Sequence, residues 1–202
     1  MRVSDCVACK AFPCIDVIHE CHLVPAIAVD PDQVRIVLVS EASPVDVDDY
    51  YYADGKPLFQ ETTVLAFNDA GAEVSSIHDI LKTGVYLTTA VKCGKTGYGI
   101  KANTIKECST LLEEELGLFP DIRAILLMGD VAIRALNYIS TRHGEGRVIP
   151  SGSTYKIRGG KYYFRNARVL PSYLQAGPSF FIEKSKRRMI AEDIRAALAI
   201  AK

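Results

Sequence analysis

The chain contains no tryptophan, only three methionines and four histidines, and no excess of either charge. Lysine and arginine together number 24, as do aspartate and glutamate, so the formal net charge is zero. This balance excludes a broadly basic nucleic-acid-binding protein, and any DNA-binding surface must be a local patch. Hydrophobic residues make up 49% of the chain and charged residues 24%, which excludes an intrinsically disordered protein.

Long apolar runs are also missing. No uninterrupted apolar stretch reaches the roughly 18 residues that a membrane-spanning helix needs. The start of the chain, from Met1 to Cys6, has no apolar run of the kind found in signal peptides. We therefore expect a cytoplasmic protein without a membrane segment. A length of 202 residues fits one large domain, so we expect a single domain over residues 1–202 that acts as a monomer.

The cysteines are informative by position. Four lie near the start and two lie far downstream: Cys6, Cys9, Cys14 and Cys21, then Cys93 and Cys108. Disulfides are rare in the cytosol, whereas thiolate metal sites are common there. A closed site that used both groups would tie the Cys-rich segment, residues 6–21, to the middle of the fold. Zinc and iron–sulfur clusters both take four thiolates, so spacing alone leaves the metal open.

Four apolar runs predict the strands of one sheet: residues 34–39, 85–91, 122–128 and 167–173. They lack polar alternation, which is typical of strands buried on both faces of a parallel sheet. The intervening patterns predict helices over residues 62–70, 104–116, 131–141 and 183–199. The pair Gly159-Gly160 predicts the tight turn of a hairpin over residues 155–164. The expected fold class is a three-layer α/β/α domain with a short, mainly parallel central sheet.

In such sheets the ligand site lies beyond the carboxyl ends of the strands. The loop after the first predicted strand, residues 40–52, carries four carboxylates and three tyrosines. A solvated acidic turn explains Asp46, Asp48 and Asp49 as well as a functional role does. Glu41 differs from them because it emerges directly from the buried strand. It is the candidate catalytic carboxylate.

Four segments in this order resemble the uracil-DNA glycosylase superfamily, above all its iron–sulfur-containing bacterial and archaeal branch. They are residues 37–42 (VLVSEA), 55–59 (GKPLF), 85–93 (VYLTTAVKC) and 125–132 (ILLMGDVA). The resemblance extends from about Cys6 to the final predicted helix. It implies a DNA base-excision glycosylase that hydrolyses the N-glycosidic bond of uracil or another modified base, with DNA as the partner.

The resemblance also implies a cofactor. In that branch a Cys-x-x-Cys near the N-terminus and two cysteines further along the chain hold a four-iron, four-sulfur cluster. Cys6, Cys9, Cys93 and Cys108 fit the arrangement, and Cys14 is a possible substitute for Cys6 or Cys9. Zinc is the alternative occupant.

Site residues follow from the same resemblance. Glu41 matches the carboxylate that positions water or stabilises the cationic sugar, and Ala42 follows it. Phe59 is the candidate for stacking on the base, although Leu58 stands at the family's aromatic position and core packing explains Phe59 equally well. Thr89 stands where the family has a base-recognising asparagine, yet threonine offers only one hydroxyl.

The last motif departs most from the family. Residues 171–179 (PSYLQAGPS) contain no histidine, and Gln175 is the candidate replacement that would donate to the leaving base. Loss of a preorganised donor costs about two to three orders of magnitude in rate. Two hypotheses follow: a base-excision enzyme that uses Glu41, and a non-catalytic iron–sulfur relative that binds DNA or nucleotides.

Two groups of basic residues could jointly contact phosphates on such a fold. They are Lys92, Lys95, Lys101 and Lys106, near the downstream cysteines, and Lys184, Lys186, Arg187 and Arg188, at the start of the last predicted helix. Taken alone, each group is equally well explained as solvated surface.

Overall fold

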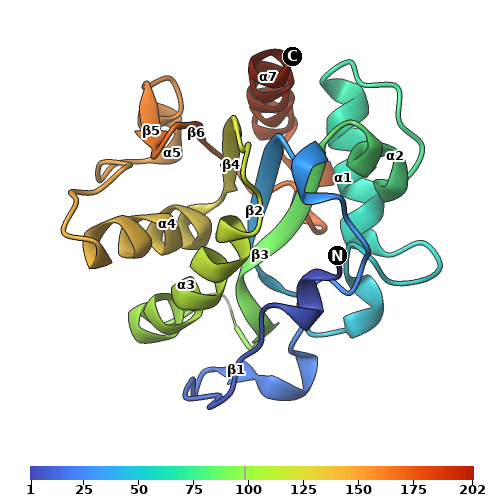
Figure 1. Ribbon diagram of the computed structural model, residues 1–202. Helices are drawn as coiled ribbons and strands as arrows, with labels where there is room; N and C mark the ends of the chain where they lie inside the picture. Colours follow the sequence, from blue (N-terminus) through green and yellow to red (C-terminus); the bar gives the residue numbers. More distant parts are fainter. Residues whose placement is uncertain (98) are drawn as a thin grey trace.

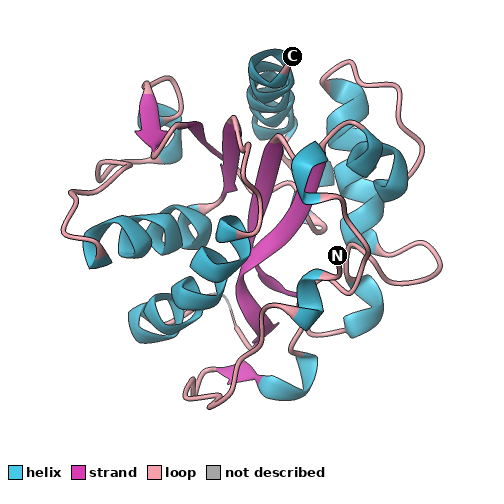
Figure 2. Ribbon diagram, viewed as in Figure 1, coloured by secondary structure: helices cyan, strands magenta, loops and turns pink. Residues whose placement is uncertain are grey.

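The computed structural model describes residues 1–97 and 99–202 and places one six-stranded sheet between two layers of helices (Figures 1 and 2). The strands are β1 (Val17–Ile18), β2 (Ile36–Ser43), β3 (Val85–Lys95), β4 (Ala124–Met128), β5 (Tyr162–Phe164) and β6 (Ala167–Ser172). Their order across the sheet is β1-β3-β2-β4-β6-β5. The expected α/β fold with a mainly parallel sheet is confirmed.

The four predicted strands form the parallel centre of the sheet. β2 pairs in parallel with β3 on one side and β4 on the other, and β4 pairs in parallel with β6. Helices cover both faces of these strands, which explains their continuous apolar sequence. The two edge strands, β1 and β5, are antiparallel and only two and three residues long. Segments that short carry no periodicity from which they could be predicted.

The α-helices are α1 (Leu58–Asp69), α2 (Ile77–Lys82), α3 (Ala102–Gly117), α4 (Asp130–Arg142), α5 (Thr154–Ile157), α6 (Ser179–Ile182) and α7 (Lys184–Ala201). Short 3-10 turns span Val3–Asp5, His19–Cys21, Pro31–Gln33 and Val47–Asp49. Helices α3 and α4 pack on one face of the sheet, and α1, α2 and α7 lie on the other (Figure 1). Among the described residues, no helix is both long enough and apolar enough to cross a membrane.

Helices α1 and α3 start two or more residues earlier than their sequence patterns predict. Helix α1 begins at Leu58 rather than Thr62, because Pro57 provides the extended N-cap and the Thr62 hydroxyl donates to the Leu58 carbonyl within the helix. It ends before Gly71, whose φ of +90° fits the predicted left-handed cap. Helix α3 begins at Ala102 rather than Thr104, and the Thr104 hydroxyl donates to Asp16.

The predicted hairpin over residues 155–164 is wrong. Residues 154–157 form the short helix α5, and the real hairpin joins β5 to β6 through a turn at Arg165 and Asn166. Arg165 takes the positive φ of +52° that the turn requires. Arg158, which follows α5, donates to the Asp193 carboxylate of α7 at 2.8 Å and so joins this region to α7.

The Cys-rich segment is tied to the middle of the fold. Asp16 accepts hydrogen bonds from the Lys101 amide at 2.6 Å and from the Thr104 hydroxyl, so its carboxylate lies at the N-terminus of α3. That position suits a negative charge. The next residues, β1, pair with Gly94 and Lys95 at the end of β3. Cys93 and Cys108 therefore lie on the two elements to which the segment is attached.

Candidate functional site

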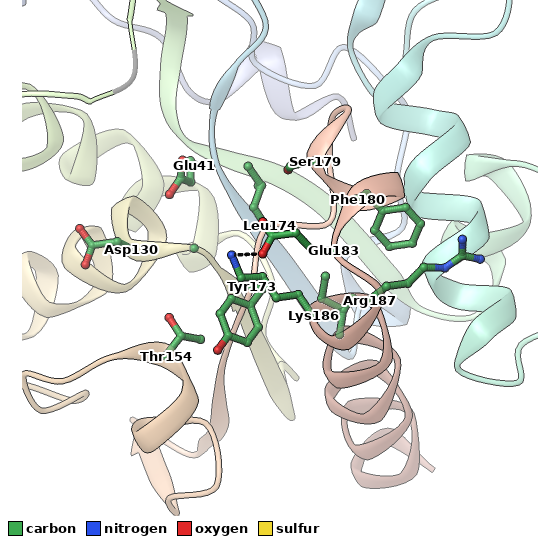
Figure 3. Close-up of a pocket in the computed structure, with 12 residues that line it drawn as sticks. Glu41, Asp130, Thr154, Tyr173, Leu174, Ser179, Phe180, Glu183, Lys186 and Arg187 are labelled. Carbon is green, nitrogen blue, oxygen red and sulfur yellow. Dashed lines mark ion pairs between the residues drawn. The ribbon is translucent and has the colours of Figure 1, made fainter.

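A cavity of about 220 Å³ lies beyond the carboxyl ends of β2, β4 and β6 (Figure 3). Its walls come from these strand ends, from α4 and α5, and from the chain that leads into α7. The lining residues are Glu41, Gly129, Asp130, Thr154, Tyr173, Leu174, Ser179, Phe180, Glu183, Lys186, Arg187 and Ile190. This is the position at which parallel α/β sheets place their ligand sites.

Glu41 is held firmly at this cavity. Its side chain is 18% exposed and its carboxylate lies 3.6 Å from the Lys95 ammonium. On the other side the carboxylate packs against Gly129, the N-cap of α4. The positive end of the helix dipole and the lysine both favour a negative charge at this point. Glu41 is therefore suited to hold a water molecule or to face a developing positive charge.

Cationic and aromatic groups form the opposite wall of the cavity. The Lys186 ammonium lies 2.6 Å from the Glu183 carboxylate and 5.4 Å from the centre of the Tyr173 ring (Figure 3). Arg187 pairs with Asp69 of α1 and lies over the Phe180 ring, 4.9 Å from its centre. The cavity thus has the Glu41 carboxylate on one side and two ion-paired cations, Lys186 and Arg187, on the other.

Gln175 lies in the protein interior and does not line the cavity. Its amide nitrogen donates to the Tyr51 hydroxyl at 2.8 Å and to the Ser40 hydroxyl at 3.2 Å, and it lies 3.4 Å from the Thr63 hydroxyl. Ser40 and Tyr51 also bond to each other. Burial raises the pKa of Tyr51 to about 12, so its hydroxyl remains protonated at neutral pH. The Gln175 amide is therefore engaged with the fold itself.

The other three predicted base contacts also lie away from the cavity. Thr89 is fully buried on β3, where its hydroxyl lies 3.4 Å from that of Ser43. Phe59 stacks at a tilt on Tyr51, with 5.3 Å between ring centres, and belongs to the apolar core around α1. Ala42 is 7% exposed and packs in the core on the opposite face of the sheet.

The neighbouring loop aspartates have structural contacts. Asp46 accepts a hydrogen bond from the Asp48 amide at 3.0 Å and so caps a 3-10 turn. Asp49 accepts from the Leu58 amide at 3.3 Å, at the start of α1. These bonds fix the loop that follows β2. Among the loop's carboxylates described above, only Glu41 lines the cavity.

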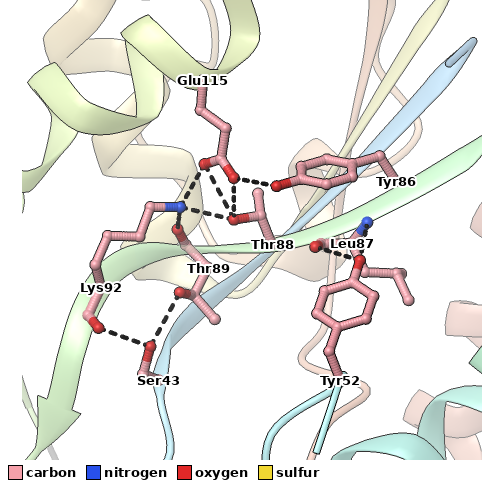
Figure 4. Close-up of polar contacts among 8 residues, drawn as sticks. All are labelled: Ser43, Tyr52, Tyr86, Leu87, Thr88, Thr89, Lys92 and Glu115. Carbon is pink, nitrogen blue, oxygen red and sulfur yellow. Dashed lines mark hydrogen bonds and ion pairs between the residues drawn. The ribbon is translucent and has the colours of Figure 1, made fainter. Parts of the chain in front are cut away.

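A buried ion pair lies behind the site, between Lys92 of β3 and Glu115 of α3 (Figure 4). Both side chains are 0% exposed. The Lys92 ammonium also donates to the Thr88 hydroxyl at 2.6 Å, and the Tyr86 hydroxyl donates to Glu115 at 2.5 Å. The prediction that Lys92 contacts phosphates is wrong, because the side chain has no access to solvent. A lysine inside an otherwise apolar strand run was the signal for this pair.

The cysteines gather around a second cavity of about 510 Å³, which Cys6, Cys9, Cys14 and Cys108 line. Burial raises the pKa of Cys108 to about 11. It also raises the pKa of Cys93 to about 12, with a further contribution from the charges of neighbouring thiols, Cys108 first. All six cysteines are free thiols.

The four N-terminal cysteines differ in their contacts. Cys14 is buried, and burial raises its pKa above the ordinary value for a thiol. Hydrogen bonds to Thr104 and Cys108 offset part of this increase. Cys6 is exposed, with its sulfur 3.6 Å from the Arg2 carbonyl, and Cys21 donates to the Val45 carbonyl at 3.0 Å. Within residues 1–97 and 99–202, no three His, Cys, Asp or Glu side chains are arranged to hold a single metal ion.

Comparison with known proteins agrees with this architecture. The family model of the uracil DNA glycosylase superfamily matches residues 27–195, which is more than half of the chain. The chain belongs to the uracil DNA glycosylase superfamily. It is also 28% identical over 99 residues to the type-5 uracil-DNA glycosylase of Thermus thermophilus, and this match covers 49% of the chain and 45% of that protein. The chain thus spans less than half the length of this curated relative.

The segment that follows β6 is divided between the cavity and the protein interior. Tyr173 and Leu174, which follow β6, reach the cavity, whereas Gln175 turns inward. The Ser172 hydroxyl donates to the Asp193 carboxylate of α7 at 2.6 Å. Among the described residues, no histidine lines the cavity beside Glu41. Its polar groups opposite Glu41 come instead from Glu183, Lys186 and Arg187. Of these, the sequence pointed only to Lys186 and Arg187, as members of a basic group.

Proposed function

We propose that this superfamily member is a DNA glycosylase that hydrolyses the N-glycosidic bond of uracil or another modified base. The observation that carries the proposal is Glu41, at the carboxyl end of β2, facing a cavity and held by Gly129 and Lys95. The family membership and the partial match to a type-5 uracil-DNA glycosylase support the same substrate class.

The proposed reaction needs a nucleotide flipped out of the base stack. The bond between the sugar C1′ and the base nitrogen breaks, and its electron pair leaves with the base. Glu41 stabilises the resulting cationic sugar and positions a water molecule, whose oxygen then bonds to C1′. The water gives up one proton in this step, and the departing base anion takes up one proton, so the charges balance. The products are the free base and an abasic sugar. Lys186, paired with Glu183, and Arg187, paired with Asp69, lie on the side of the cavity opposite Glu41, where they can face a departing base.

We further propose that residues 1–202 act as one domain in which a four-iron cluster joins the Cys-rich segment to β3 and α3. The thiol donor set fits such a cluster: Cys6, Cys9, Cys14 and Cys108 line one cavity, and the charges of Cys108, Cys14, Cys9 and Cys21 add to the effect of burial on the pKa of Cys93. Zinc is the alternative occupant, because it also takes four thiolates. Contact between Cys14 and Cys108 favours Cys14 over the exposed Cys6.

The alternative function is DNA or nucleotide binding without efficient excision. It is favoured by one observation: the Gln175 amide, the candidate replacement for the missing histidine, is occupied by Ser40 and Tyr51. Under this alternative the fold and the cluster remain, and Glu41 would be a structural contact of Gly129 and Lys95.

An excision assay over a panel of DNA substrates, each with one modified base, distinguishes the two functions. We expect wild-type protein to release at least one base, and Glu41→Gln to lower the rate by about 10² to 10⁴ with DNA binding retained. Asp48→Asn is the matched control, because Asp48 is exposed in the same loop. If wild-type protein releases no base, the binding-only function is correct. Equal activity of Glu41→Gln and wild type would place the catalytic group elsewhere.

A further inference from the structure

One segment of this electrically neutral chain is strongly basic and aromatic. Residues 147–168, here called the basic segment, contain six lysines and arginines and no aspartate or glutamate. The rest of the chain carries 18 basic residues against 24 acidic ones. The basic segment also contains three tyrosines and one phenylalanine. It includes α5, β5 and the first residues of β6, at the edge of the sheet (Figure 1).

Two arginines use their charge to fix the basic segment in place. Arg158 donates to Asp193 at 2.8 Å and to Glu192 at 3.0 Å, both on α7. Arg168 donates to the carbonyls of Gly160 at 2.9 Å and Tyr162 at 3.0 Å, which joins the turn before β5 to β6. The surface of the segment is therefore held rigidly against the sheet and α7.

The remaining cations of the basic segment face solvent: Arg147, Lys156, Lys161 and Arg165 are exposed. Arg165 lies 3.5 Å from Glu113, whereas Lys156 and Lys161 make no ion pair with any residue in 1–97 or 99–202. Two tyrosines are exposed beside them, Tyr155 at 71% and Tyr163 at 61%. The Arg168 guanidinium lies 5.5 Å from the centre of the Tyr163 ring and orients it.

The basic segment is continuous with the catalytic cavity. Thr154 lines the cavity, and Tyr155 is the next residue of the same short helix. Helix α5 packs against β6, which pairs with β5, the strand that carries Tyr163. The exposed Tyr155 therefore follows a cavity residue directly, and the exposed Tyr163 lies on the strand next to the one that α5 contacts.

We propose that the basic segment binds single-stranded DNA next to the target nucleotide. Exposed aromatic rings bind unpaired bases by stacking, and cations between the rings neutralise the phosphates. In duplex DNA the base faces are already stacked on one another, so Tyr155 and Tyr163 find few free base faces to stack on and contribute less to the affinity. This inference rests on the proposed function and adds to it a preference for a single-stranded substrate.

Binding to an unmodified oligothymidine tests the proposal, because this probe contains no base to excise. In fluorescence anisotropy we expect wild-type protein to bind it. Tyr155→Ala with Tyr163→Ala should weaken binding at least about tenfold, whereas Tyr155→Phe with Tyr163→Phe should retain it. The double alanine variant should lose less affinity for a target-free duplex of the same length than for the single strand. Unchanged single-strand binding by the double alanine variant, or equal losses on both probes, would overturn the proposal.

The salt dependence of the same binding tests the charges. Lys156→Glu with Lys161→Glu should reduce the log–log salt slope by about 1.4, because each phosphate contact on a single strand contributes about 0.7. Lys82→Glu with Lys202→Glu is the matched control, because both residues are exposed and lie outside the basic segment, Lys82 at the end of α2 and Lys202 after α7. Equal slopes for the two double variants would contradict the inference. Since no excision is measured, an inactive wild-type protein with the expected binding would refute only the proposed function.

Discussion

The Glu41 carboxylate packs against the α-carbon of Gly129. A β-carbon at position 129 would lie 2.6 Å from Oε1 of Glu41, and the φ of Gly129 is +101°, which side-chain-bearing residues rarely adopt. β2 delivers the carboxylate and β4 ends at the glycine, so two neighbouring parallel strands set the position of the candidate catalytic group. Gly129 thus has a role at the site without contributing a functional group.

Gly129→Ala should therefore displace Glu41 and strain the start of α4. We expect excision to fall by about 10²-fold, since small displacements of a catalytic group have effects of this size. The free energy of unfolding should fall by about 1–3 kcal/mol because of the unfavourable φ. Excision kinetics and urea denaturation measure the two effects. Gly144→Ala is the matched control, since Gly144 has a φ of +75° and no atom within 4 Å of an added β-carbon. Full activity in Gly129→Ala would mean that this contact does not position Glu41.

The ion pair between Lys92 and Glu115 predicts strong non-additivity. Lys92→Met leaves the Glu115 carboxylate buried without its counter-charge, and Glu115→Gln leaves the Lys92 ammonium in the same state. Each variant should lose about 3–5 kcal/mol of stability. The double variant Lys92→Met with Glu115→Gln should lose clearly less than the sum of the two losses, because neither charge is then left buried alone. Denaturant unfolding of the four proteins measures this coupling, and strict additivity would show that the pair is not coupled.

Some elements of the fold could be predicted from the sequence and others could not. The β-branched runs around Leu38, Leu87 and Leu126 predict the central strands because burial on both faces leaves a continuous apolar pattern. The hairpin prediction failed at Gly159, because the turn lies instead at Arg165, a residue without turn preference. Contacts far apart in the sequence, such as that of Arg158 with Asp193, decide this region, and no local pattern encodes them.

The candidate site shows the same division. Glu41 could be placed because its position depends on one strand and on the general rule for parallel sheets. Gln175 could not, because its direction depends on Tyr51 and Ser40, which lie far away in the sequence. Lys186 and Arg187 were visible only as a basic group, since their place on the cavity wall depends on how α7 packs against α1.

The cysteine contacts predict which thiols matter for the proposed cluster. Cys14→Ala should lower the iron content and the melting temperature of protein purified without oxygen, because metal binding contributes directly to stability. Cys21→Ala is the control, because the Cys21 thiol already donates to the Val45 carbonyl. This variant should keep the iron. Cys6→Ala tests the competing assignment. A visible iron–sulfur absorption that survives Cys14→Ala and is lost in Cys6→Ala would assign the ligand to Cys6. Colourless protein with bound zinc would exclude the cluster.

The buried tyrosine network predicts a defined response to alkaline pH. Burial raises the pKa of Tyr51 from 10.0 in the unfolded chain to about 12 in the fold. Below pH 10 the phenol is protonated in both states, so it adds no pH dependence. As the pH rises from 10 to 12, only the unfolded chain ionises, and the stability should fall by about 2–3 kcal/mol from this group alone. Burial also raises the pKa values of Tyr50, Tyr52 and Tyr86, which act in the same direction.

Tyrosinate absorbance measured together with the unfolding free energy tests this response. The buried phenols should ionise in the same pH range in which the protein unfolds, not at pH 10. Tyr51→Phe should be less stable at pH 7 by about 1–3 kcal/mol, because Ser40 and Gln175 lose a buried hydrogen-bond partner. It should also lose less stability than wild type between pH 10 and 12. If the buried phenols of folded wild type titrate near pH 10, Tyr51 is accessible to water, and Gln175 is then free to turn toward a bound base.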